Sequence, residues 1–273
     1  MATPELKVVA MPTGWLTVDH SSLVYGRHYG QPLRIPVWSS AIVGGDKKIV
    51  VDTGIHDPGW VSSFICPCDQ APEERLERAL KEYVGWRADD VDIVINTHLH
   101  YDHSGGNTLF RNARFIVQQT EWEYAARPLD TQTSLYHEFL IGREPLAWFR
   151  WQFVNGIADI APGVRVFPTP GHTPGHQSVA VNTAEGIAVI TGDCANCMEN
   201  IVDGVPVGII WQTEAELASL KRIRQIADLV IPGHDPDVVA GSAGLRLPAS
   251  ARLPHVENTA STANNAYGTN TAT

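Results

Sequence analysis

The sequence predicts an α/β protein that carries its chemistry at the ends of strands, and three observations support this. Apolar runs of strand length alternate with segments in which apolar residues recur at helical spacing. Several apolar runs end directly at histidine or aspartate residues. The chain has 273 residues, enough to bury about three quarters of its unfolded surface as one large domain or two similar halves. Strand ends of this kind are where α/β folds place binding and catalytic groups.

The first half of the chain contains the early strands and one surface helix. Strands are expected over residues 7–11, 36–43 and 48–51, the last ending at Asp52. Residues 72–84 have acids in their first turn and apolar residues at helical spacing, which predicts a helix. We expect Asp52 either to cap a turn or to hydrogen-bond a ligand histidine, and favour the second role.

The run Val91–Asn96 predicts a buried strand that leads into a dense group of metal-ligand residues. His98, His100, Asp102 and His103 fall within six residues. In an extended segment, positions i and i+2 share a face, so the first two imidazoles should project together while Leu99 turns to the core. We expect the glycine pair at 105–106 to let the chain bend sharply after them.

Three further candidate ligands follow in the second half of the chain. His172 lies in a Pro/Gly turn, Asp193 ends the apolar run from Ile187, and His234 follows the run from Leu229. A helix is expected over 213–226 with Thr213 as its N-cap. A catalytic zinc takes three protein ligands plus water, so seven candidates exceed one ion. Two divalent metals sharing one carboxylate match the count, most simply zinc, with iron, manganese or cobalt as alternatives.

Four motifs in this order resemble the metallo-β-lactamase superfamily: HLHYDH at 98–103, TPGHTPGH at 169–176, GD at 192–193 and PGHD at 232–235. Within it, the chain is most similar to the N-acyl homoserine lactonases, and this similarity runs from roughly residue 7 to 240. The narrower resemblance rests on the segments 16–22, 35–38, 116–123 and 175–178.

The resemblance implies a fold, a ligand assignment and an activity. The fold would be an αββα sandwich. His98, His100 and His172 would hold one metal, Asp102, His103 and His234 the other, with Asp193 bridging the two. The activity would be lactone-ring opening of N-acyl homoserine lactones, which quenches bacterial signalling, by a water that the two metals activate. Asp102 would pass the proton to the leaving alkoxide.

One departure from the lactonase pattern bears on the substrate. Those enzymes usually carry a tyrosine three residues after the bridging aspartate, and here that position is Asn196. An asparagine amide still donates a hydrogen bond, but it is shorter and supplies no phenolic proton. We therefore predict Tyr101, Asn196 and His20 as substrate-binding residues, and keep other small lactones, cyclic esters or amides, and thioesters as alternative substrates.

Other metal chemistries with the same ligands are less favoured. A thioesterase acting on glutathione esters would need a basic pocket, and the closest zinc β-lactamases place a cysteine where Asp193 stands. A redox di-iron protein of this superfamily would carry an appended flavin domain, for which the chain has no room. A non-catalytic binding module is weaker still, because all seven ligands are kept.

Composition excludes several function classes. The formal net charge of −10 argues against nucleic-acid binding, which needs clustered Lys and Arg. The sequence has no apolar run near the roughly 18 residues of a membrane span. Residues 1–6 show no basic start followed by an apolar segment, so we expect a cytoplasmic enzyme with a small-molecule lactone substrate.

Domain limits and the remaining candidates complete the prediction. Residues 1–248 should form the catalytic domain and 249–273 a disordered tail rich in Ala, Ser, Thr and Asn. Residues about 128–156 carry six aromatic residues and should form either a lid-like insertion over the metals or an amphipathic helix packed on the core. A homodimer through the exposed aromatics is one compatible state.

The cysteines and the other histidines have simpler roles. A zinc site from the pairs Cys66/Cys68 and Cys194/Cys197 is possible on residue type, but small buried thiols are the favoured interpretation. We expect His176 to support its turn or to orient a ligand histidine.

Overall fold

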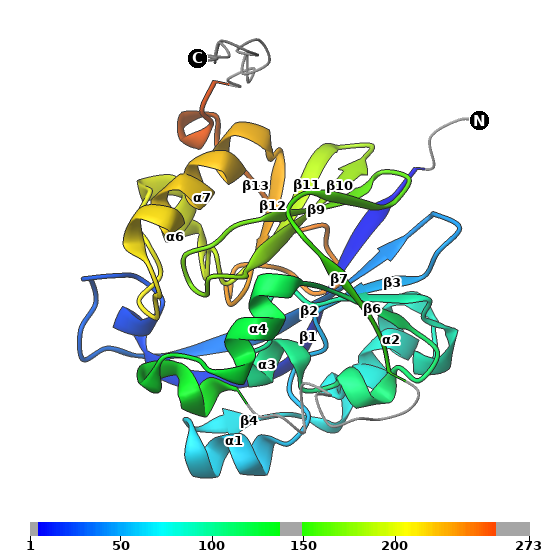
Figure 1. Cartoon of the computed structure of the whole chain (residues 1–273), viewed down its shortest axis with the longest axis horizontal. Coiled ribbons are helices and arrows are strands. Elements are labelled where there is room, and N and C mark those ends of the chain that lie inside the picture. Colours follow the sequence, from blue (N-terminus) through cyan, green and yellow to red (C-terminus); the bar gives the residue numbers. More distant parts are fainter. Residues whose placement is uncertain (1–4, 137–148, 255–273) are drawn as a thin grey trace, which may run out of the picture.

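A computed structural model of the chain describes residues 5–136 and 149–254. Two mixed β-sheets lie face to face with helices on their outer surfaces, as Figure 1 shows. The strand orders are β4-β1-β2-β3-β5-β6-β7 and β13-β12-β11-β10-β9-β8. The predicted αββα sandwich is therefore confirmed.

Strands before about residue 155 form the first sheet, and strands after it form the second. The first sheet contains β1 (Lys7–Asp19), β2 (Pro32–Val43), β3 (Ile49–Val51), β4 (Cys68–Asp69), β5 (Ile93–Ile95), β6 (Arg114–Gln118) and β7 (Arg150–Val154). The second contains β8 (Ala158–Ala161), β9 (Val164–Pro168), β10 (Gln177–Thr183), β11 (Gly186–Gly192), β12 (Leu229–Pro232) and β13 (Leu245–Arg246). The α-helices are α1 (Pro58–Phe64), α2 (Leu76–Val84), α3 (Tyr101–Ser104), α4 (Gln119–Ala126), α6 (Met198–Asp203) and α7 (Thr213–Ile226).

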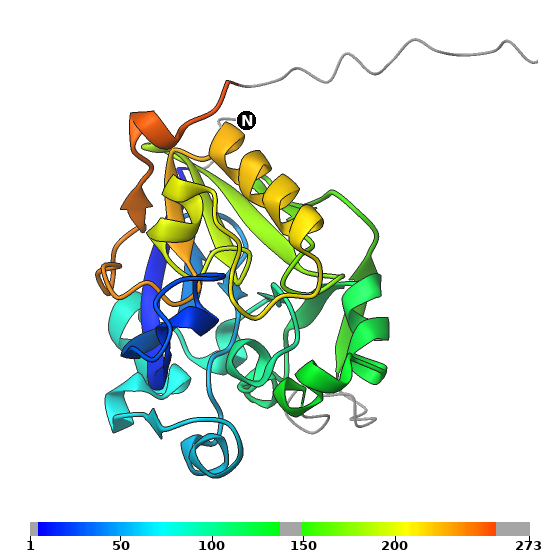
Figure 2. The same cartoon turned by 90° about the vertical axis from the view of Figure 1, so that its left-hand side faces the viewer.

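Central strands of both sheets are buried on both faces, which explains their continuous apolar sequences. In β5, Ile95 joins the core between the sheets while Val94 packs outward in the cluster that includes α2. In β12, Ile231 points into the same central core while Val230 packs outward with α7. The view in Figure 2, turned by a quarter, shows α7 along the outside of its sheet.

Parallel pairing brings the ends of four strands to the same region. β3 pairs in parallel with β5, and β11 pairs in parallel with β12. The segments that follow these strands carry Asp52, His98, Asp193 and His234. The expectation that polar residues gather at strand ends is thus met in both sheets.

The first two strands are longer than predicted, and the third, β3, is one residue shorter. β1 and β2 pair antiparallel from Lys7 to Asp19, with an irregularity between Pro12 and Trp15. Proline and glycine interrupt the local pattern there, and only the long cross-strand pairing carries the strand past them. The predicted helix over 72–84 divides into a 3₁₀ turn at 72–74 and α2. Thr213 is the first residue of α7 and not its N-cap, which is Gln212.

The described part of the region about 128–156 does not form an amphipathic α-helix. The lid interpretation stays a prediction, because residues 137–148 lie outside the described residues. The described part contains a 3₁₀ helix at 130–135 and the strand β7, which pairs in parallel with β6. Trp151 on β7 lies between Phe149 and Phe153, with ring centroids 5.8 and 6.4 Å away. Three of the six aromatic residues therefore line β7. Phe139 and Trp148 lie outside the described residues.

The described chain also continues past the predicted domain end at 248. Residues 249–251 form a 3₁₀ turn, and Ala251 is only 1% exposed. Arg224 donates from Nε to the Ala251 carbonyl at 2.7 Å, which ties this turn to α7. Within residues 5–136 and 149–254, no helix is long and apolar enough to cross a membrane.

Candidate metal centre

The first four candidate ligands follow β5 in a tight turn and the short helix α3. His98 and His100 lie in a bend and not in an extended strand, yet Leu99 packs into the core beside Val117 as predicted. Asp102 and His103 lie on α3. The hydroxyl of Ser104 donates to the carbonyl of residue 100 at 2.9 Å and closes this turn.

The glycine pair after α3 serves close packing and not a bend. Gly105 and Gly106 have ordinary φ values of −57° and −86°. A Cβ on Gly105 would lie 2.5 Å from the Tyr101 carbonyl oxygen and 2.7 Å from that of Gly54. The predicted reason for these glycines was therefore wrong: a side chain has no room there.

The second sheet supplies the other three candidate ligands. His172 lies in the loop between β9 and β10, Asp193 follows β11, and His234 follows β12. Gly233 is needed for this approach, since a Cβ there would lie 2.4 Å from Asp193 Oδ1. All seven predicted ligands are buried and lie together, four from the first half of the chain and three from the second.

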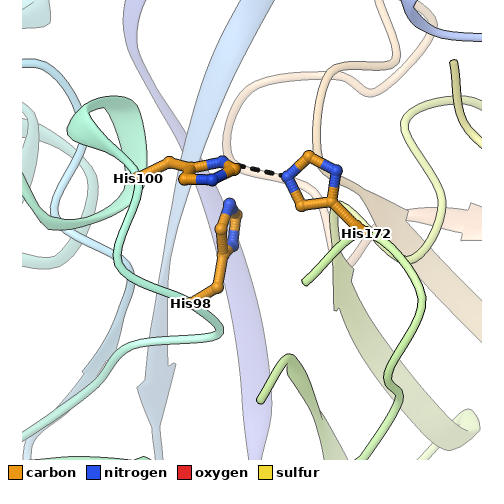
Figure 3. A group of neighbouring side chains, drawn as sticks. All are labelled: His98, His100 and His172. Atoms are coloured by element: carbon orange, nitrogen blue, oxygen red, sulfur yellow. Dashed lines mark hydrogen bonds between the residues drawn. The ribbon is translucent and has the colours of Figure 1, made fainter. Parts of the chain in front are cut away.

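Three groups of three residues at the centre have the geometry of a metal site. The group of His98, His103 and Asp193 overlaps the other two, which share no member. One of these two is His98, His100 and His172, which Figure 3 shows converging from two loops. The other is Asp102, His103 and His234. Within each group, one ligand atom per residue lies within 4.8 Å of the others. The two groups that share no member are the two sets that the family resemblance implied.

Asp193 lies between the two groups. Its Oδ1 is 3.0 Å from His103 Nε2 and 3.2 Å from His234 Nε2, whereas its Oδ2 is 3.5 Å from His172 Nε2. Asp102 Oδ2 lies 3.6 Å from His234 Nε2. Nitrogen and oxygen ligands of a tetrahedral zinc are about 3.3 Å apart. The spacing therefore suits two ions with Asp193 as the bridging carboxylate.

The donor atoms also lack other partners. The Nε2 atoms of His98 and His100 are buried without a hydrogen bond, and Nε2 of His103 and Oδ1 of Asp193 have only ion-pair contacts within the centre. A buried polar atom without a partner is costly, and bound cations would satisfy all four. Burial also lowers the pKa of His98 and His100 well below the usual value, which keeps these imidazoles in the neutral form that binds metals.

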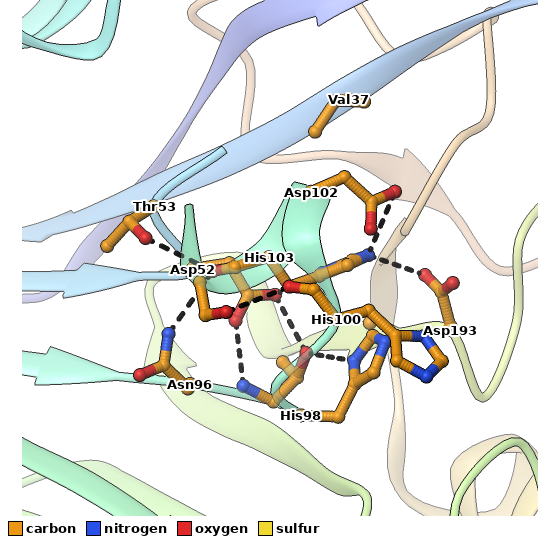
Figure 4. Close-up of polar contacts among 12 residues, drawn as sticks. Val37, Asp52, Thr53, Asn96, His98, His100, Asp102, His103 and Asp193 are labelled. Atoms are coloured by element: carbon orange, nitrogen blue, oxygen red, sulfur yellow. Dashed lines mark hydrogen bonds and ion pairs between the residues drawn. The ribbon is translucent and has the colours of Figure 1, made fainter. Parts of the chain in front are cut away.

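Asp52 orients one ligand and confirms the favoured prediction for that residue. Its Oδ2 is 2.9 Å from His103 Nδ1, and its carboxylate accepts hydrogen bonds from the Thr97 backbone and hydroxyl at 2.7 and 2.8 Å (Figure 4). Asp52 has a left-handed φ of 57°, a rare conformation held here by those contacts. Burial alone would lower the pKa of His103, but Asp193, Asp102 and Asp52 together raise it.

Backbone carbonyls orient two further imidazoles. His172 Nδ1 lies 2.7 Å from the carbonyl of Ile209, and His234 Nδ1 lies 2.9 Å from that of Pro36. These contacts leave Nε2 of both rings for the centre. His176 supports its own loop as predicted, because its Nδ1 lies 2.9 Å from the hydroxyl of Thr169.

Glu121, on α4, joins the two histidine loops and was missed as a site residue. Its Oε1 accepts from the Leu99 N–H at 3.1 Å and from the Tyr136 hydroxyl at 2.8 Å, and its Oε2 accepts from the Thr173 hydroxyl at 2.6 Å. Burial raises the pKa of Glu121. The available signal was an acidic residue shortly after a buried strand, the same pattern as Asp52. Tyr136 also sets its ring 4.6 Å from that of His100.

A cavity of about 60 Å³ reaches the centre. Tyr101 and Asn196 line it as predicted, and Asn196 Oδ1 is buried there without a hydrogen bond. His20 is not among the lining residues, and its ring stacks on His28 instead. The apolar part of the lining consists of Leu16, Val18, Leu23, Ile35, Leu135 and Ile209.

The cysteines do not form a second metal site within the described part of the chain. None of the four belongs to a group of side chains placed to hold an ion. Cys194 is fully buried in the apolar cluster of α7, and burial raises the pKa of its thiol. The favoured interpretation of small buried groups fits this residue.

Comparison with known proteins decides the family. Residues 33–234 match the family model described as the metallo-beta-lactamase superfamily. The chain belongs to the metallo-β-lactamase superfamily. The buried His/Asp groups described above are those of a metal-dependent hydrolase of this fold.

Two curated relatives of this metallo-β-lactamase member are lactonases. An N-acyl homoserine lactonase of Bacillus thuringiensis is 32% identical over 244 residues, covering 84% of this chain and 93% of that protein. The N-acyl homoserine lactonase AttM of Rhizobium radiobacter is 33% identical over 263 residues, covering 86% and 95%. A solved N-acyl homoserine lactone hydrolase with its product N-hexanoyl-L-homoserine bound at the catalytic metal centre has a TM-score of 0.74 and 31% identity, covering 86% and 95%.

Proposed function

We propose that this metal-dependent hydrolase opens the lactone ring of N-acyl homoserine lactones. The observation that carries the proposal is the cavity, in which five of the seven His/Asp residues meet a wall of six apolar side chains. A polar end with an apolar wall matches a substrate that joins a lactone to an acyl chain. Relatives at 32–33% identity that are N-acyl homoserine lactonases support the same substrate class.

Two divalent metals, with zinc as the first choice for these His/Asp donors, would supply Lewis-acid polarisation of the carbonyl and an activated water. His98, His100 and His172 would hold one, Asp102, His103 and His234 the other, with Asp193 between them.

The chain's own residues have distinct tasks in this reaction. Asp102 lines the cavity, and its carboxylate would take a proton from the attacking water and deliver it to the leaving alkoxide. The Asn196 amide can donate a hydrogen bond to a substrate carbonyl. The hydroxyl of Tyr136 does not replace the tyrosine hydroxyl that the lactonases carry at the position of Asn196. It donates a hydrogen bond to Glu121 instead.

Asn196 also favours a second candidate, hydrolysis of another small lactone or a thioester by the same chemistry. A glutathione thioester is the weakest of these. Among the described residues that line the cavity, there is no Lys or Arg to pair with the carboxylates of glutathione.

The test is a hydrolysis assay on purified protein of known metal content. Hexanoyl and decanoyl homoserine lactones are compared with unsubstituted γ- and δ-lactones and with a glutathione thioester. We expect chelator-sensitive opening of the homoserine lactones by protein that holds about two metals per chain. Activity on the simple lactones alone would support the second candidate function, hydrolysis of another small lactone. A two-metal protein that is inactive on every ester would refute the proposal.

A further inference from the structure

A second group of metal-ligand side chains lies outside the buried centre. His20, His28 and Glu199 each place one ligand atom within 4.8 Å of the other two. His20 lies in the 3₁₀ turn that follows β1, and Glu199 lies in the first turn of α6. The segment after β1, blue in Figures 1 and 2, accordingly lies beside α6. Residues far apart in the sequence therefore meet here.

The contacts in this group resemble those between ligands of one ion. His28 Nε2 lies 3.0 Å from both carboxylate oxygens of Glu199. The rings of His20 and His28 are stacked, with centroids 4.0 Å apart and planes within 11°. Two protonated imidazoles would repel at that distance, so at least one ring is neutral. Burial, followed by the nearby His28, lowers the pKa of His20, which favours the neutral form of that ring.

The backbone conformation of His28 directs its side chain towards Glu199. His28 has a left-handed φ of 58°, and Asp52 is the only other described non-glycine residue with a positive φ. Such a conformation is unfavourable for an L-residue and persists where the surroundings hold it, commonly at functional sites. At Asp52 it positions a group that orients a ligand of the buried centre. At His28 it directs the imidazole to Glu199.

The local charge favours a cation. Glu199 belongs to the group, Asp19 acts electrostatically on His20, and Asp203 shares the cation of Arg27 with Glu199. Arg27 Nη1 lies 2.7 Å from Glu199 Oε1 and also contacts Asp203. Glu199 Oε2 remains directed at His28. A simple His28–Glu199 ion pair would explain those two residues but not the second imidazole stacked beside them.

We propose that His20, His28 and Glu199 form a third metal site for a borderline-soft divalent cation such as Zn²⁺, separate from the two in the buried centre. Two imidazoles and one carboxylate are a ligand set that zinc uses, and the partly exposed position leaves room for water as a further ligand. The His28 and Glu199 side chains are about 32% and 27% exposed, so they can adjust to one ion.

A cation at this site would link two segments that line the substrate cavity, the one after β1 and the one that leads into α6. Ser22 and Leu23 lie two and three residues after His20 and line the cavity, and Asn196 lines it from the segment that leads into α6. Ser22 also accepts hydrogen bonds from the N–H groups of Gly208 and Ile209, and Ile209 lines the same cavity. The ion would thus stabilise the rim of the cavity without touching the reacting groups.

The experiment counts zinc in matched proteins at equilibrium with the same buffered free Zn²⁺. Wild type is compared with His28→Asn, Glu199→Gln and the control His56→Asn, which changes an exposed histidine. Asparagine tolerates the left-handed backbone of His28, so that variant tests the imidazole alone. We expect wild type and H56N to bind one equivalent more than H28N and E199Q. Equal zinc content in all four proteins would overturn the proposal.

Two further readouts separate a metal site from an ion pair. Arg27→Ala removes the cation that competes for Glu199, so it should lower the Kd of the additional zinc. A higher Kd in R27A would contradict the site. In protein with ¹⁵N-labelled histidine, one equivalent of zinc beyond the buried sites should shift the ring signals of His20 and His28, and unshifted signals would overturn the assignment. Because every readout measures zinc binding and not turnover, none depends on whether the protein hydrolyses lactones.

Discussion

Asp102 would combine two tasks, because its carboxylate belongs to the second ligand group and also lines the cavity. We expect Asp102→Asn to reduce kcat for hexanoyl homoserine lactone by about 100-fold or more, since an amide cannot carry the proton to the leaving group. Steady-state kinetics should be measured beside metal analysis of the same samples. Full turnover by a variant with intact metal content would exclude the relay role.

Asp52 acts on the centre only through His103. Asparagine keeps the size of the side chain and tolerates the left-handed φ of 57°, so Asp52→Asn removes the charge without adding backbone strain. Loss of such an orienting carboxylate lowers metal affinity by roughly 10- to 100-fold. Competition with a chromophoric chelator measures this affinity. Asp46→Asn, at an exposed turn, is the control and should bind metal as wild type does.

The residues of the centre show which parts of the site can be predicted from the sequence. All seven predicted ligands are buried at the same centre. They could be predicted because histidine and aspartate at strand ends form a short-range sequence pattern. Glu121 was not singled out, since its partners Leu99, Tyr136 and Thr173 lie 15 to 52 residues away. Only the folded chain shows that one carboxylate joins three separate segments. His20 was misplaced for the same reason, because its stacking partner His28 carries no motif.

At the scale of elements, α4 holds two loops in register through Glu121. Glu121→Gln replaces an acceptor by an amide N–H that faces other donors, which costs about 1–3 kcal/mol of unfolding free energy. The loops that carry His98, His100 and His172 should then bind metal more weakly. Urea unfolding and a metal titration test both effects. Glu123→Gln on the same helix is the matched control, because Glu123 is exposed and accepts a hydrogen bond from Gln119 only four residues away.

The loop between β9 and β10 packs directly against the start of α4. A Cβ on Gly175 would lie 2.0 Å from the backbone nitrogen of Glu121, and backbone cannot move aside as a flexible side chain can. We expect Gly175→Ala to destabilise the fold by about 1–3 kcal/mol, the usual cost of overpacking. Thermal unfolding measures this. Gly45→Ala meets only the end of the Leu6 side chain at 3.1 Å and should be close to neutral; equal losses in both variants would contradict the packing argument.

For the whole molecule, the layered fold was predictable and the limits of its elements were not. Double-sided burial makes strands such as β5 and β12 continuous apolar runs, which sequence patterns detect. The length of β1 depends on pairing with β2 across Pro12 and Gly14, and the strand β7 depends on β6 as a partner. Such long-range pairing has no local signature, so residues 128–156 were assigned to a lid or a helix.

The centre itself spans the two halves of the sandwich, because four candidate ligands follow β5 and three follow strands of the second sheet. Metal removal should therefore lower global stability as well as activity. Binding at about 1,000 times Kd contributes about 4 kcal/mol, and a chain of this size shifts by about 2–4 °C per kcal/mol. We expect Tm to fall by roughly 10 °C after chelation and dialysis, and to recover when zinc is returned. A metal-free protein with an unchanged Tm would mean that the two halves hold together without the ions, and would contradict a shared centre.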